Sequence, residues 1–84
     1  MRNSGRATKR AMQGVIDDIH DYSDAVRTLL DYMRYDVSSL NDDWNDSQFD
    51  RLEEALESFI HSVESRLNDM ENAAFELKKK VEML

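Results

Sequence analysis

The chain of 84 residues contains no cysteine, no proline and only two glycines. Without cysteine, neither a disulfide nor a thiolate metal site can form. Without proline, and with Gly14 as the sole glycine after Gly5, nothing in the body of the chain forces a long helix to end. No apolar run is long enough to cross a membrane, and the basic first ten residues lead into an amphipathic segment, so we expect no secretory signal peptide.

Apolar residues recur at steps of three and four on both sides of a polar break, and this spacing predicts two amphipathic helices. The first stripe comprises Met12, Val15, Ile19, Tyr22, Val26, Leu30, Met33, Val37 and Leu40. The second comprises Phe49, Leu52, Leu56, Phe59, Val63, Leu67, Met70, Ala74, Leu77, Val81 and Leu84. Relative to a strict heptad repeat, one extra residue lies between Val26 and Leu30 and another between Val63 and Leu67.

The sequence therefore predicts an all-α fold of two long antiparallel helices in a hairpin, over about residues 10–40 and 46–84, joined by a turn at 41–45. Residues 1–9 are expected to form a basic, flexible tail. The net charge is −7, and the acidic residues lie between the basic ends of the chain. Such a body should not bind nucleic acid, and the first ten residues, with four basic and no aromatic side chains, are a weak signal for membrane binding.

The break contains residues typical of a helix start. Asn45 is expected to cap the second helix, with Gln48 completing a capping box, although Asp46 or Ser47 would serve one or two residues later. With Asn45 as the cap, Trp44 and Phe49 take the two positions of a hydrophobic staple. The only tryptophan of the chain is therefore expected to close the hairpin.

Several apolar residues widen the two stripes beyond what one facing helix would cover. The candidates for a further interface are Ile16, Leu29, Ile60 and Phe75, with Tyr32 and Tyr35 at its rim. Scattered exposed apolar residues are the ordinary alternative, since monomers commonly carry them. The number of such residues favours dimerisation of the hairpin into a four-helix bundle.

A catalytic or metal-binding function has little support. Asp17, His20, Asp21 and Asp24 share one helical face, and a solvated charged face is the simpler interpretation. In helical di-metal bundles a carboxylate precedes each histidine ligand by three residues, whereas Ser58 takes that place before His61. We therefore expect no metal, no cofactor and no enzymatic activity.

In its overall plan the chain resembles the small WXG-type proteins associated with bacterial type VII secretion. The resemblance rests on Trp44 in the connecting turn, with Leu40 before it and Phe49 and Leu52 after it; Asp46 stands where the family has glycine. It implies a homodimeric or heterodimeric four-helix bundle, exported without a cleavable signal peptide, which acts as secretion partner, adaptor or carrier for a larger effector. The alternative is an intracellular helical adaptor that binds one amphipathic helix of a client protein.

Overall fold

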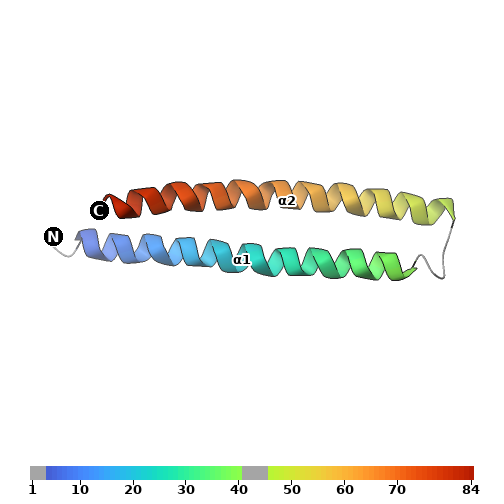
Figure 1. Cartoon of the computed structure of the whole chain (residues 1–84), viewed down its shortest axis with the longest axis horizontal. Helices are drawn as coiled ribbons and strands as arrows, with labels where there is room; N and C mark the ends of the chain where they lie inside the picture. Colours follow the sequence, from blue (N-terminus) through green and yellow to red (C-terminus); the bar gives the residue numbers. More distant parts are fainter. Residues whose placement is uncertain (1–3, 41–45) are drawn as a thin grey trace.

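The computed structural model describes residues 4–40 and 46–84, which form two helices. Helix α1 spans Ser4–Leu40 and helix α2 spans Ser47–Glu82. The helices lie side by side and run in opposite directions, so the start of α1 and the end of α2 are at the same end of the molecule (Figure 1). The molecule is 65 Å long and about 15 Å wide. The predicted all-α helical hairpin is confirmed.

Helix α1 begins earlier than the sequence predicts. It starts at Ser4, so the expectation of a flexible tail over residues 1–9 is wrong for residues 4–9, which are helical. Ala7, Lys9 and Arg10 are good helix formers and continue the helix toward the N-terminus. From Arg6 to Ala11 the side chains are exposed, and Met12 is the first partly buried side chain of α1.

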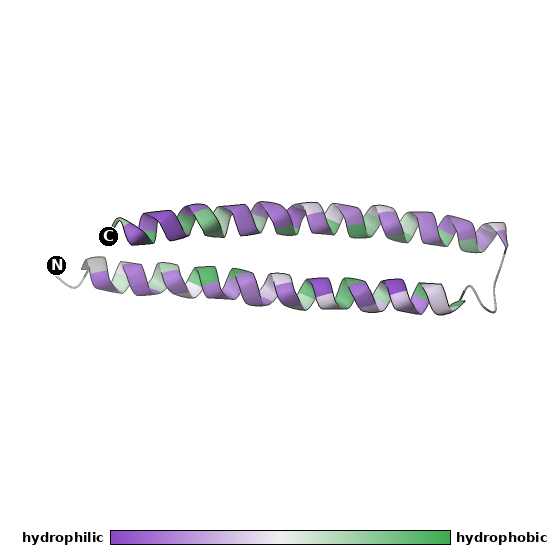
Figure 2. Ribbon diagram, in the orientation of Figure 1, coloured by the Kyte–Doolittle hydropathy of each residue, from purple (hydrophilic) through white to green (hydrophobic). Residues whose placement is uncertain are grey.

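The residues that α1 and α2 bury against each other form a strict heptad repeat, which we call the seam. In α1 the seam comprises Met12, Ile16, Ile19, Ser23, Val26, Leu30, Met33 and Val37. In α2 it comprises Phe49, Leu56, Ile60, Val63, Leu67, Met70, Ala74, Leu77 and Val81. With the heptad written abcdefg, Ile16 and Ile60 occupy a positions, while Ile19 and Val63 occupy d positions. The side of α2 that faces α1 carries hydrophobic residues along its length (Figure 2).

The seam differs in phase from the predicted stripes. Val15, Tyr22 and Phe59 were expected in the core, but they are exposed, and their neighbours Ile16, Ser23 and Ile60 are buried instead. The extra residues at Val26–Leu30 and Val63–Leu67 consequently do not interrupt the seam. The extra residues appear in the predicted stripes because each stripe alternates d positions with exposed g positions in its first part. In its second part it alternates d positions with buried a positions.

Asp46 caps the N-terminus of α2. Its backbone is extended, and Oδ1 accepts hydrogen bonds from the backbone N–H groups of Gln48, at 2.8 Å, and Phe49, at 3.1 Å. The preferred assignment of the cap to Asn45 is therefore wrong by one residue, and the alternative cap at Asp46 is confirmed. With this cap, Gln48 no longer occupies the capping-box position.

Replacing the cap tests this boundary. Asp46→Ala is expected to lower the free energy of unfolding by about 1 kcal/mol, because two backbone N–H groups of α2 lose their acceptor. Urea denaturation of the variant measures the loss. Asp46→Asn is the matched control, since its side-chain oxygen can still cap the helix, and an equal loss in both variants would contradict a capping role.

Candidate interaction surface

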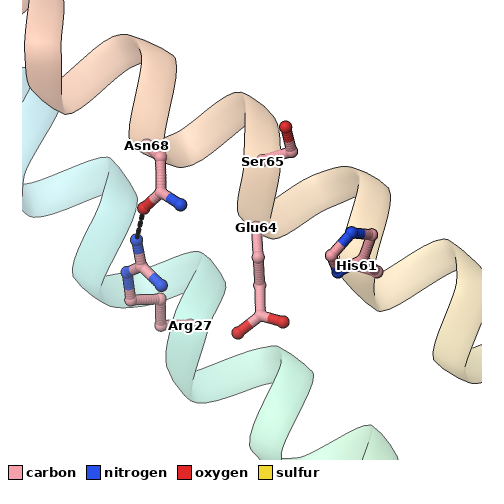
Figure 3. Close-up of a pocket in the computed structure, with 5 residues that line it drawn as sticks. All are labelled: Arg27, His61, Glu64, Ser65 and Asn68. Carbon is pink, nitrogen blue, oxygen red and sulfur yellow. Dashed lines mark hydrogen bonds between the residues drawn. The ribbon is translucent and has the colours of Figure 1, made fainter.

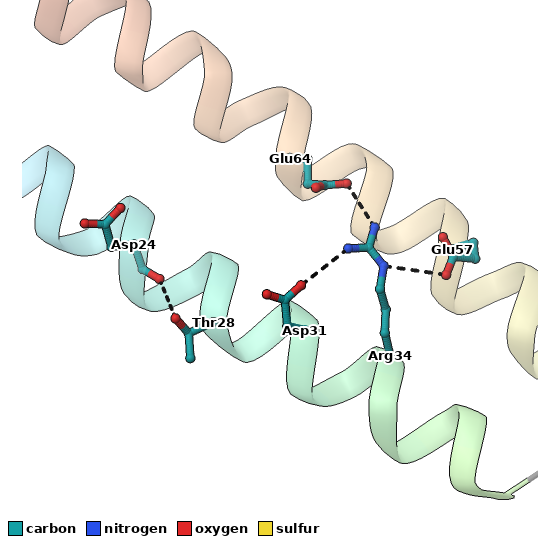
Figure 4. Close-up of polar contacts among 6 residues, drawn as sticks. All are labelled: Asp24, Thr28, Asp31, Arg34, Glu57 and Glu64. Carbon is teal, nitrogen blue, oxygen red and sulfur yellow. Dashed lines mark hydrogen bonds and ion pairs between the residues drawn. The ribbon is translucent and has the colours of Figure 1, made fainter.

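Ion pairs between α1 and α2 lie along one side of the seam. Arg34 reaches Asp31 on its own helix at 3.7 Å, and Glu57 and Glu64 on α2 at 3.7 and 3.2 Å (Figure 4). Arg27 pairs with Glu71 at 3.2 Å. All of these interhelical pairs join e positions, so the e positions of both helices lie on the same side of the hairpin. We call this side the charged face.

A polar layer interrupts the seam at Ser23, which is 1% exposed. Its hydroxyl donates a hydrogen bond to Glu71 Oε1, and the Arg27 guanidinium donates to the same oxygen and to Asn68 Oδ1. A buried hydroxyl without a partner would be costly, and the carboxylate of Glu71 provides the acceptor for the Ser23 hydroxyl. The hydrogen bond from Ser23, followed by that from Arg27, lowers the pKa of Glu71 below its ordinary value.

The lowered pKa of Glu71 predicts a pH dependence of stability. Because the folded state favours the ionised carboxylate, its contribution is complete above about pH 4.5, the ordinary pKa of glutamate, and is lost as pH falls through the lower folded pKa. Glu71 is partly solvated, so we expect this contribution to stay below about 1 kcal/mol. Urea denaturation of wild type and Glu71→Gln at pH 7 and pH 3 provides the test. The free energies of unfolding of the two proteins should differ less at pH 3 than at pH 7. A constant difference would contradict the assignment.

A hollow on the charged face is lined by Arg27, His61, Glu64, Ser65 and Asn68 (Figure 3). Its volume is about 310 Å³ and it is open to solvent. Arg27 and Glu64 are already engaged in ion pairs with Glu71 and Arg34. The guanidinium and the carboxylate that line the hollow are therefore both already paired within the hairpin.

The four side chains considered as possible metal ligands are Asp17, His20, Asp21 and Asp24, and all four are exposed on α1. Among the residues that the structure describes, no three His, Cys, Asp or Glu side chains gather to hold a metal ion. Within the same residues, neither helix has a stretch long and apolar enough to cross a membrane.

The opposite side of the seam exposes large apolar side chains, with the charged residues Asp36, Arg66 and Lys80 among them. Its g positions, and one adjacent c position, present six large apolar side chains that are all at least one-third exposed. We call this surface the apolar face; it comprises Val15, Tyr22, Leu29 and Tyr32 of α1 with Leu52 and Phe59 of α2. Since the e positions of both helices lie on the charged face, the g positions of both must lie together on the other side. The hairpin therefore has two chemically different faces.

The predicted interface residues are distributed over several surfaces. Leu29 and Tyr32 belong to the apolar face, while Ile16 and Ile60 are buried in the seam and were wrongly placed on an outer interface. Tyr35 is exposed at an f position, on the side of α1 opposite the seam. Trp44 and Asn45 lie outside the described residues, so the contact predicted between Trp44 and Phe49 stays a prediction.

Phe75 is exposed on the side of α2 that carries the charged face. Lys79 lies over its ring, with Nζ 4.6 Å from the ring centre, and pairs with Glu76. This aromatic side chain is therefore partly covered by its own helix. It is separated from the apolar face by the seam.

Val15, Tyr22, Leu52 and Phe59 belong to the apolar face although the sequence predicted them in the core. One signal in the sequence distinguishes the two sides of each stripe. At the positions that directly flank the core residues, charged residues recur every seven positions on one side only, at Arg27 and Arg34 in the first helix and at Glu57, Glu64 and Glu71 in the second. Comparisons of the chain with protein-family models, curated proteins and solved structures find no match.

Proposed function

We propose that this protein is a non-enzymatic, dimer-forming helical hairpin that serves a type VII-like secretion system, either as a substrate or as a partner and adaptor of a larger effector. The apolar face carries the proposal, because α1 and α2 expose six large apolar side chains on one side of the seam, where a further helical layer would cover them. Trp44 lies between the two helices in the sequence. It supports the link to type VII secretion, because the resemblance to WXG-type proteins rests on this residue.

The role in secretion follows from that resemblance and requires a test in the host. The protein would be made in the cytoplasm and exported without a cleavable signal peptide. We expect the chain to accumulate in the culture medium of its native host and to remain in the cells when the membrane ATPase of the secretion system is deleted. Retention in wild-type cells, with every candidate partner co-expressed, would overturn the secretion role.

The same surface supports a second candidate function, that of an intracellular adaptor. An amphipathic helix of a client could lie on the apolar face and cover the exposed side chains of Leu29 and Phe59. Phe59→Asp would then abolish capture of the client from host extract, while Phe75→Asp on the other side of α2 would leave it intact. Ile60→Asp is unsuitable for this test, since Ile60 is buried in the seam and the substitution would unfold the hairpin.

A further inference from the structure

We propose that one end of the hairpin binds anionic lipid membranes, with the acidic body of the molecule directed away from the lipid. The antiparallel arrangement of α1 and α2 brings together two basic segments that lie far apart in the sequence (Figure 1). We call this part of the molecule the basic end; its basic side chains are those of Arg6, Lys9 and Arg10 in α1 and of Lys78, Lys79 and Lys80 in α2. The inference does not depend on the dimer of the proposed function.

Contacts between the helices fix where these side chains lie. Val81 belongs to the same buried cluster as Ile16, and Met12 packs against that cluster. The last turn of α2 therefore lies beside the early turns of α1, and all six basic side chains are exposed. Since successive residues of a helix are about 100° apart, the three consecutive lysines point in three directions. Positive charge therefore surrounds the end of the hairpin and does not form a stripe along one side.

The basic end contrasts with the rest of the molecule. Residues 4–12 and 78–84 carry six basic side chains and one acidic side chain, that of Glu82. Residues 17–40 and 46–77 carry fifteen acidic and four basic side chains. Of the six basic residues, Lys79 alone has an ion-pair partner among the residues that the structure describes, which is Glu76. The other five are available to an anionic partner.

Helix stability does not account for the basic residues of α1. Positive charge is unfavourable near the N-terminal end of a helix dipole, and the first turn of α1 contains no acidic residue. Lys79 and Lys80 lie in the last turn of α2, where they stabilise that helix, but the hairpin places them near Arg6 and Lys9 and so adds repulsion between like charges. An anionic surface would relieve this repulsion.

The basic end also exposes apolar side chains, which favours a lipid membrane over a nucleic acid. Met83 is 84% exposed and Leu84 is 61% exposed. These side chains can enter the boundary between headgroups and acyl chains while the neighbouring lysines contact lipid phosphates. The phosphates of a nucleic acid would attract the same charges but would leave both apolar side chains in water.

Three double variants with the same change in net charge test the basic end. Each replaces two exposed basic residues by glutamine, which is a good helix former. The variants are Arg6→Gln with Arg10→Gln, Lys78→Gln with Lys80→Gln, and, as the matched control in the body of the molecule, Arg51→Gln with Arg66→Gln. The measurement is cosedimentation of the whole chain at low salt with vesicles made of equal parts of phosphatidylserine and phosphatidylcholine.

We expect both variants of the basic end to bind these vesicles at least about tenfold more weakly than wild type, since each Lys or Arg near an anionic membrane strengthens binding about fivefold. The control variant should bind as wild type does. Three results would overturn the inference: no binding of wild type to the vesicles, equal weakening in all three variants, or weakening by the α1 substitutions alone.

A further variant distinguishes a lipid membrane from other polyanions. Met83→Ser leaves every charge of the basic end in place but removes its most exposed apolar side chain. We expect it to weaken vesicle binding several-fold, because less apolar surface enters the membrane. Unchanged vesicle binding by this variant, together with equally tight binding of wild type to duplex DNA, would overturn the assignment to lipid.

Discussion

Ile60→Ala is expected to lower the free energy of unfolding by about 2–5 kcal/mol, because Ile60 is 0% exposed within the seam. A domain of this size is stabilised by only about 4–13 kcal/mol in total. The substitution should therefore remove a large share of that stability. Urea denaturation followed by circular dichroism at low protein concentration provides the measurement.

The neighbouring residue gives the matched control. Phe59 is 52% exposed, so at low protein concentration Phe59→Ala should lower the free energy of unfolding much less than Ile60→Ala does. This difference is expected although Phe59→Ala removes the larger side chain. Its effect should grow with protein concentration, because association stabilises a folded dimer by mass action. A larger loss for Phe59→Ala than for Ile60→Ala in the dilute chain would show that the helices pack in the phase of the predicted stripe.

The second large effect concerns self-association. Phe59→Ala is expected to weaken the dimer at least about tenfold, which corresponds to about 1.4 kcal/mol, because truncating a large aromatic side chain that is buried in an interface can cost this much. The dissociation constant can be measured by energy transfer between chains labelled at their N-terminal amines. Wild type and variant must be compared at the same salt concentration.

Phe75→Ala is the control for that measurement. The two phenylalanines belong to the same helix and are similarly exposed, at 52% for Phe59 and 58% for Phe75, but they lie on opposite sides of the seam. We therefore expect Phe75→Ala to leave the dissociation constant unchanged. Equal weakening by both substitutions would contradict a dimer that uses the apolar face alone.

The sequence predicts the two helices correctly because their apolar periodicity is long and nothing inside them breaks a helix. It does not determine the phase of packing, since adjacent apolar residues such as Val15 and Ile16, or Phe59 and Ile60, fit a helical stripe equally well. Hydrophobicity alone also assigns Tyr22 to the core in place of Ser23. The partner that makes Ser23 suitable for burial, Glu71, lies 48 residues away in the chain.

The candidate surface could be predicted only in part for the same reason. Leu29 and Tyr32 were identified from the sequence, whereas Tyr22 and Phe59 were assigned to the core and so excluded from the surface. The start of α2 was uncertain by one or two residues because Asn45, Asp46 and Ser47 all have side chains that cap helices. The extended backbone and the hydrogen bonds of Asp46 identify it as the cap, and the residue types alone do not distinguish the three candidates.

Sedimentation equilibrium of the wild-type chain over a wide concentration range tests the central claim most directly, which is that a second copy covers the apolar face. We predict a single folded species of about twice the 9.8 kDa chain mass, dissociating only on strong dilution. A fully helical species that remains at 9.8 kDa at millimolar concentration would contradict the account, since it would show that the hairpin keeps its apolar face exposed to water.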